Sequence, residues 1–106
     1  MREATFLILT ALTGEARHGY GIIQEVAQLS AGRVRLLPGT LYTALDRLVA
    51  QGLVEFDREE VIDGRARRYY RLCTDGRTEL ASQAARLREL ASAAESRLGN
   101  LRPNLA

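Results

Sequence analysis

The 106-residue sequence has one cysteine, one histidine, no tryptophan and no lysine. Cys73 cannot form an internal disulfide, which suits a reducing compartment, and Cys73 with His18 alone cannot build a metal site. Neither residue has an evident third partner for nucleophilic catalysis, and paired carboxylates occur only in one strongly charged segment. We therefore expect no enzymatic activity, no cofactor and no metal.

The sequence also lacks a long hydrophobic run. The apolar segment at residues 6–12 is interrupted by Thr10 and is too short to span a bilayer. It follows a single basic residue, and no small-residue cleavage site is evident nearby. We expect a cytoplasmic protein that does not associate with membranes.

The composition is otherwise that of one small globular domain, with 46% hydrophobic and 26% charged residues. The formal net charge is only +2, which does not by itself argue for a nucleic-acid partner. All fifteen basic residues are arginines, and guanidinium groups bind phosphate and guanine in a bidentate manner. The distribution of these arginines therefore matters more than their number.

Apolar residues at helical spacing predict three short helices, over residues 2–12, about 19–30 and 40–51. Residues 33–37, with the sequence RVRLL, read as a small strand between the second and third helices. Pro38 and Gly39 precede the third helix and Gly52 ends it.

After Gly52 the period changes from 3.6 to 2, which predicts an antiparallel hairpin. Val54 and Phe56 fall on one side of the outgoing strand, and Asp63-Gly64 is a strong turn signal before RRYYRL at 67–72. The order helix, helix, small strand, helix, hairpin is that of a winged helix-turn-helix, so the predicted fold is mainly α with a small β-hairpin.

Residues 74–101 read as one long helix with an apolar seam at heptad spacing. The seam consists of Leu80, Ala84, Leu87, Ala91, Ala94, Leu98 and Leu101. So small a domain offers this seam no obvious partner, so it predicts a homodimer; the alternative is a helix that folds back on its own domain. We divide the chain into a winged helix-turn-helix at 1–73 and a dimerisation helix at 74–106, with a frayed end at 102–106.

The third helix has a second face. When Leu41, Leu45 and Leu48 point inward, the 100° step turns a set of short or polar residues outward, with Tyr42 at the boundary. The outward set is Thr40, Thr43, Asp46, Arg47 and Ala50. Small residues near the start and hydrogen-bonding groups further on suit a helix in the DNA major groove, although a solvated helix would show the same pattern.

The hairpin carries opposite charges on its two strands. Arginines crowd the turn and the returning strand, and acidic residues crowd the outgoing strand, so that ion pairs can neutralise several of them. These residues are Arg65, Arg67, Arg68 and Arg71 on one side and Glu55, Asp57, Glu59 and Glu60 on the other. Arg65, beside the turn glycine, is where a wing would contact the DNA backbone or minor groove.

The segments HGYGIIQEV, LLPGTLYTALDRLVAQGLVE and DGRARRYYRL, followed by DGRTEL, resemble the signature segments of the PadR family of bacterial transcriptional regulators. The single C-terminal helix resembles the smaller PadR subgroup. The resemblance implies a winged-helix homodimer that represses promoters and releases DNA when an inducer or another signal arrives.

Residue by residue, the resemblance implies DNA contacts from Thr40, Tyr42, Thr43 and Arg47, with Tyr42 on phosphate and Thr43 or Arg47 nearest the bases. It implies wing contacts from Arg65 and Arg67, and a structural role for Tyr20 and Tyr70. The chain departs from the family pattern at Cys73 and at Leu37, where a small polar residue is more usual. The effector site is unknown, and Phe6 is the nearest candidate.

The sequence thus predicts a sequence-specific DNA-binding regulator, a homodimeric repressor that reads an inverted-repeat operator in double-stranded DNA. A small-molecule effector belongs to this expectation, but its identity and existence stay open. The alternative is a winged-helix protein-interaction module that does not bind DNA directly; the small net charge and the acidic outgoing strand leave it open.

Overall fold

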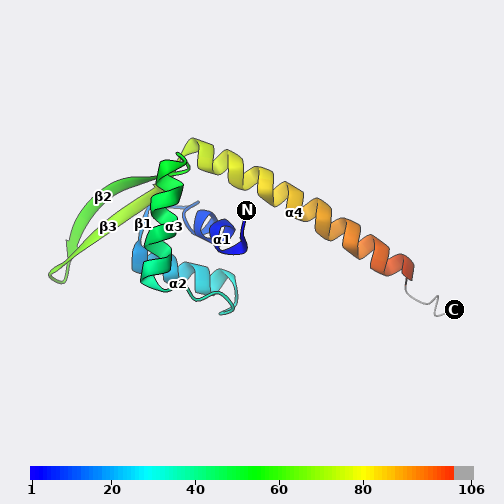
Figure 1. Cartoon of the computed structure of the whole chain (residues 1–106). Coiled ribbons are helices and arrows are strands. Elements are labelled where there is room, and N and C mark those ends of the chain that lie inside the picture. The colour runs from blue at the N-terminus through cyan, green and yellow to red at the C-terminus, as the bar shows by residue number, and fades with distance from the viewer. Residues whose placement is uncertain (102–106) are drawn as a thin grey trace.

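The computed structural model describes residues 1–101, with side chains described to residue 99. Its elements are α1 (Glu3–Ala11), β1 (Arg17–His18), α2 (Gly19–Leu29), α3 (Pro38–Ala50), β2 (Val54–Ile62), β3 (Arg65–Leu72) and α4 (Thr74–Leu101). The helices α1 to α3 form a compact body, the β2–β3 hairpin extends from one side of it, and α4 extends from the other (Figure 1). The side chain of Leu101 and the predicted frayed end at 102–106 lie outside the described residues.

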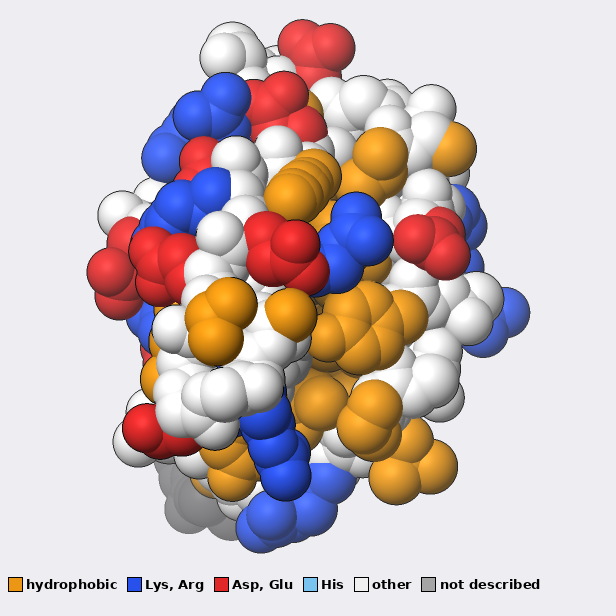
Figure 2. Space-filling view, turned by 90° about the vertical axis from the view of Figure 1, so that its left-hand side faces the viewer, with side chains coloured by type: hydrophobic (Ala, Val, Ile, Leu, Met, Phe, Trp, Pro, Cys, Tyr) orange, Lys and Arg blue, Asp and Glu red, His pale blue; other side chains and the backbone are white. Residues whose placement is uncertain are grey.

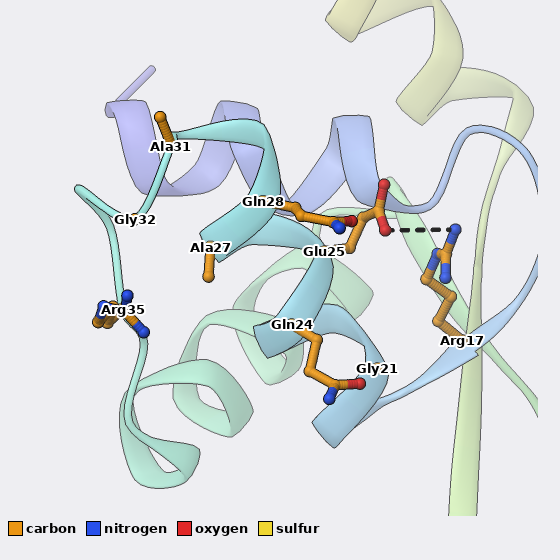
Figure 3. A pocket seen from close by; sticks show the side chains of 9 residues that line it. All are labelled: Arg17, Gly21, Gln24, Glu25, Ala27, Gln28, Ala31, Gly32 and Arg35. Carbon is orange, nitrogen blue, oxygen red and sulfur yellow. Dashed lines mark ion pairs between the residues drawn. The ribbon is translucent and has the colours of Figure 1, made fainter.

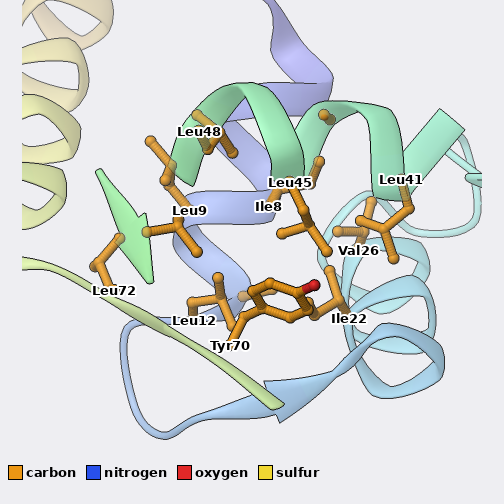
Figure 4. Close-up of a cluster of buried hydrophobic side chains, with 13 residues drawn as sticks. Ile8, Leu9, Leu12, Ile22, Val26, Leu41, Leu45, Leu48, Tyr70 and Leu72 are labelled. Atoms are coloured by element: carbon orange, nitrogen blue, oxygen red, sulfur yellow. The ribbon is translucent and has the colours of Figure 1, made fainter. Parts of the chain in front are cut away.

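The three leucines predicted to point inward from α3 form the centre of the core. Leu41, Leu45 and Leu48 are each at most 1% exposed, and they pack against α1, α2 and the sheet (Figure 4). The helix begins at Pro38, two residues before the predicted start, because proline is well accommodated in the first helical turn. The core therefore fixes which face of α3 remains outside.

The predicted strand at 33–37 is wrong. Besides the two hairpin strands, the sheet contains β1 (Arg17–His18). This strand pairs antiparallel with β3 and gives the strand order β1-β3-β2. The backbone N–H of Val34 instead donates to the hydroxyl of Ser30, at 2.9 Å, and the Val34 side chain packs against the core. The segment after α2 is thus held by the end of that helix and not by the sheet.

The hairpin forms at the predicted turn, where Asp63 and Gly64 both have positive φ, as a type I′ turn requires. Val54 is buried as predicted. Phe56, predicted on the same side, is 40% exposed. Phe56 pairs with the buried Tyr70 as Val54 pairs with Leu72, so it lies on the predicted side but farther out along the hairpin; the register shifts only beyond it, between Phe56 and Arg58.

Helix α4 is anchored to the body only near its start. A side chain at Gly76 would collide with the carbonyl of Leu53, so glycine lets the first turn approach the backbone there. Leu80 packs against the core, whereas Leu87 and Leu98 are 49% and 66% exposed. The far part of the helix does not fold back on the described part of its own chain (Figure 1). No helix within residues 1–101 is long and apolar enough to cross a membrane.

Candidate nucleic-acid interface

The exposed face of α3 forms a ridge between two grooves. Thr40, Thr43 and Arg47 line a groove shared with α1. Tyr42 lines a second groove, of about 360 Å³, which α3 shares with the start of α2 and the hairpin. All four predicted DNA-contacting residues of this helix are exposed, on two sides of one ridge.

Arg47 lies across the first groove toward α1. Its Nη2 atom donates to the hydroxyl of Thr5 over 3.3 Å, in a contact at the surface. The bond orients the guanidinium group without burying its charge, so several N–H donors remain for another partner.

Tyr42 is 40% exposed and its ring packs over the start of α2. The hydroxyl lies so close to Gly19 that a side chain at that position would collide with it. This close approach sets the angle between α2 and α3. Tyr42 is therefore a packing residue that remains partly exposed.

Of the four arginines predicted to pair with the acidic strand, only Arg71 does so within the described residues, and Arg58, which was not predicted, pairs within β2 itself. Arg71 pairs with Glu55 at 2.6 Å and with Asp57 at 3.5 Å, and Arg58 pairs with Glu60 at 2.7 Å. The hydrogen bond from Arg58 lowers the pKa of Glu60, and the bond to Glu55 raises the pKa of Arg71. Most of the acidic charge of β2 is therefore directed at these two arginines.

Three other hairpin arginines make no ion pair with any side chain that the structure describes. They are Arg65, Arg67 and Arg68. All three line the groove that contains Tyr42. Arg67 lies 5.9 Å from the centre of the Tyr20 ring, and Arg68 lies 4.8 Å from that of Phe56. From the hairpin side, apolar side chains are exposed at the middle of this face, with basic and acidic groups around them (Figure 2).

Tyr70 and Tyr20, both expected to be structural, differ in burial. Tyr70 is 6% exposed and belongs to the core, as predicted. The expectation that Tyr20 packs onto the core is wrong, since it is 56% exposed. It is the second residue of α2 and points into the groove toward Arg67, because the core-facing positions of this helix are Ile22 and Val26.

Comparisons with known proteins agree with this architecture. The model of the transcriptional regulator PadR-like family matches residues 8–82. The chain belongs to the PadR-like family.

A related protein of this family is the transcriptional regulator Rv3488 of Mycobacterium tuberculosis, which is 46% identical over 74 residues. That match covers 70% of this chain and 65% of the relative, just under two thirds of its length.

Two solved structures show the same fold. A PadR family transcription regulator from Clostridium difficile superposes with a TM-score of 0.72 and 25% identity, over 92% of this chain and 99% of that chain. Bacillus subtilis PadR, solved in complex with operator DNA, gives a TM-score of 0.68 and 21% identity, over 78% of this chain and 48% of that chain. The winged-helix fold of this PadR-family chain therefore rests on both its own elements and its relatives.

His18 has a structural position in this PadR-family chain. Its Nδ1 atom accepts the backbone N–H of Gly21 at 3.1 Å and so caps α2. Burial, and secondarily the positive charge of Arg67, lowers the pKa of His18. Its ring also meets Tyr69 edge to face, with 5.2 Å between ring centres. The position of His18 directly before the predicted second helix is a signal for such a cap in the sequence, whereas the contact with β3 depends on the fold.

Cys73 joins β3 to α4 and is partly buried. Burial, and secondarily the negative charge of Glu55, raises the pKa of its thiol. A thiol whose pKa is raised forms little thiolate at neutral pH and reacts slowly. No group of three His, Cys, Asp or Glu residues within the described chain could hold a metal ion.

Two further cavities lie outside the interface. An open one of about 680 Å³ lies along the outer side of α2, where Arg17 approaches Glu25 at 3.7 Å (Figure 3). The other, of about 420 Å³, is more enclosed and contains Phe6, the candidate effector residue, with Leu29 and Leu87. Phe6 thus lines a mainly apolar cavity between α1, the end of α2 and α4.

Proposed function

We propose that the chain is a sequence-specific DNA-binding regulator in which α3 enters the major groove and the hairpin contacts the DNA backbone or minor groove. The observation that carries the proposal is the set Arg65, Arg67 and Arg68, which have no acidic partner among the described residues. Phosphate is the partner that such a set of guanidinium groups suits best.

The family gives independent support. The relative from M. tuberculosis is a transcriptional regulator, and B. subtilis PadR has been solved with operator DNA. The charge pattern of the hairpin argues against the alternative of a protein-interaction module, because the acidic side chains that left it open are largely paired with Arg58 and Arg71.

Within the proposed complex the residues have different roles. Thr40 and Thr43 have short side chains at the start of α3 and allow close approach to the groove, and Arg47 reaches base edges or phosphate one turn later. Tyr42 contributes its exposed edge to phosphate. Arg65 and Arg67 contact the backbone at the wing and carry no base information.

The proposed active form is a homodimer, formed through the exposed seam of α4. Two copies of α3 related by a twofold axis would lie about 34 Å apart, one turn of B-DNA, and would read an inverted repeat. Binding to an inverted repeat within a promoter excludes polymerase, so we propose a repressor. A small-molecule effector that releases the DNA would enter the cavity beside Phe6, and a ligand screen by thermal shift with Phe6→Ala as control tests this.

The central experiment measures binding of the purified protein to DNA from its own upstream region and to random duplex, over a range of salt concentrations. The expected result is a preference for the upstream DNA, with affinity that falls steeply as salt rises because counterions are released from phosphate. Equal, weak binding to both duplexes at every salt concentration would contradict the proposal.

Alanine variants test the division of roles. Arg47→Ala is expected to relax the preference for the upstream site by about 1–3 kcal/mol, whereas Arg65→Ala weakens binding to all duplexes alike and lowers the salt dependence. Arg71→Ala is the matched control on the same strand, because Glu55 and Asp57 already neutralise that arginine. An Arg71 variant that binds as poorly as the Arg65 variant would show that charge pairing does not select the contacts.

A further inference from the structure

Two consecutive leucines precede α3 and point in opposite directions. Leu36 packs against the core, whereas Leu37 is 71% exposed. Among large apolar side chains, only Val61 at the hairpin is more exposed within the described part of the chain. The fold therefore does not require an apolar residue at position 37.

Leu37 also occupies a position where a polar residue would stabilise the fold. It is the N-cap of α3, and the helix has no side-chain cap there. Serine, threonine, asparagine or aspartate at an N-cap would accept a free backbone N–H of the first turn. The chain thus exposes an apolar group and also forgoes a cap at the same residue.

The surroundings of Leu37 leave room for a large partner. The next residues, Pro38 and Gly39, are exposed, and a side chain built at Gly39 would meet nothing within 4 Å. Pro38 borders the groove toward the hairpin, and Gly39 and Thr40 border the groove toward α1. Leu37 therefore stands at the leading end of the ridge that α3 forms.

We propose that Leu37 contacts the C5-methyl group of a thymine in the major groove and selects T at that position in each half-site. The inference rests on the proposed function, in which the start of α3 enters the groove. The thymine methyl is the apolar group that the major-groove edges of the four base pairs present, and a branched aliphatic side chain is its natural complement.

The chemistry of the patch selects DNA over a protein partner. Along the chain Leu37 is followed by Pro38, Gly39 and Thr40, with exposed Arg35 two residues before it. The exposed Tyr20 and Tyr42 lie in the groove that Pro38 borders. Leu87 and Leu98 of α4 lie on the seam assigned to the dimer, and the exposed Leu90 lies off it. Leu37 offers one branched apolar side chain at the leading end of α3, next to Pro38, Gly39 and Thr40, which suits a single methyl group.

The test first obtains the preferred duplex by selection from random sequences, with the full-length protein. Each thymine of a half-site is then replaced by uracil, which removes the methyl group and leaves the Watson–Crick and groove hydrogen bonds unchanged. We expect one thymine whose replacement weakens binding about fourfold per half-site, which corresponds to about 0.8 kcal/mol for one buried carbon.

The variant Leu37→Ser, tested on the thymine and uracil duplexes, shows whether Leu37 makes the methyl contact. It is expected to bind the thymine duplex about as weakly as the wild type binds the uracil duplex, and to show no further loss with uracil. Val49→Ser, which changes a 40% exposed residue at the other end of α3, is the control and should keep the full fourfold difference.

The outcomes separate the two proposals. Failure to select any preferred duplex would overturn the proposed function itself. Selective binding that is insensitive to every thymine-to-uracil change would overturn only the role of Leu37. A uracil effect that persists in Leu37→Ser would also overturn it, and would assign the methyl contact to another residue such as Thr40 or Thr43.

Discussion

Helices α3 and α4 are both amphipathic, but leucines of α3 are buried whereas leucines of α4 are exposed. Leu41 and Leu45 of α3 are completely buried in their own chain. Leu87 and Leu98 of α4 are 49% and 66% exposed. In α3 the fold buries the apolar face and exposes the polar face, whereas in α4 much of the apolar seam is itself exposed.

The largest expected effect concerns the buried face of α3. Leu45→Ala removes a side chain with 0% exposure and should lower the free energy of unfolding by about 2–5 kcal/mol, because burial is lost and a cavity remains. Chemical denaturation followed by circular dichroism measures this. Val49→Ala, on the exposed side of the same helix, should cost less than about 1 kcal/mol; equal losses would remove the contrast between the two faces.

The next effect concerns the exposed seam of α4. Leu98→Glu should weaken self-association by about 3 kcal/mol, since each of two copies loses roughly 1.5 kcal/mol of apolar burial. Sedimentation equilibrium measures the shift toward monomer. Ser96→Glu adds the same charge on the opposite side of the helix and should leave association nearly unchanged, and a monomeric wild type at micromolar concentration would contradict the role given to the seam.

These two helices were also the most predictable part of the molecule. The bounds of α4 and the inward leucines of α3 follow from long periodic patterns, which the sequence carries locally. The strand Arg17–His18 has only two residues and no period, so no local pattern predicts it, whereas the segment RVRLL at 33–37 wrongly suggests a strand.

The sequence predicts which residues of α3 are exposed at the candidate interface, but not which contacts they make. The exposure of Thr40, Thr43 and Arg47 followed from the helical step. The bond from Arg47 to Thr5 joins residues 42 positions apart, and the exposure of Tyr20 depends on how α2 meets the hairpin. Such contacts arise from tertiary packing, which no local pattern encodes.

A smaller effect concerns the support of α3 by α2. Tyr42 packs against Gly19, the first residue after the His18 cap, so the start of α2 holds α3 in place. His18→Ala removes the acceptor for Gly21 and should lower stability by about 1 kcal/mol, measured by denaturant unfolding. His18→Asn retains an acceptor at the N-cap and should recover most of the loss. If asparagine is as destabilising as alanine, the cap is not the source of the effect.

The same histidine predicts a pH dependence. Burial lowers the pKa of folded His18, so the unfolded chain binds this proton at a higher pH than the folded chain. Its contribution to stability is complete above about pH 6.5 and is lost as the pH falls through the lowered pKa of the folded state. Melting temperatures from pH 8 to pH 5 should therefore fall more for the wild type than for His18→Asn; parallel curves would contradict this assignment.

The smallest expected effect is a gain in the free energy of unfolding, from a change at the start of α3. Leu37→Ser replaces an exposed apolar group with a good N-cap and should raise the free energy of unfolding by about 0.5–1 kcal/mol. Denaturant unfolding measures the gain, and Leu37→Ala, which supplies no cap, is the control. A serine variant that is more stable but discriminates less between thymine and uracil would show that Leu37 lowers the stability of the fold and contributes the contact with the thymine methyl group. A loss of stability in the serine variant would mean that Leu37 packs against the fold after all, as the leucines further along the helix do.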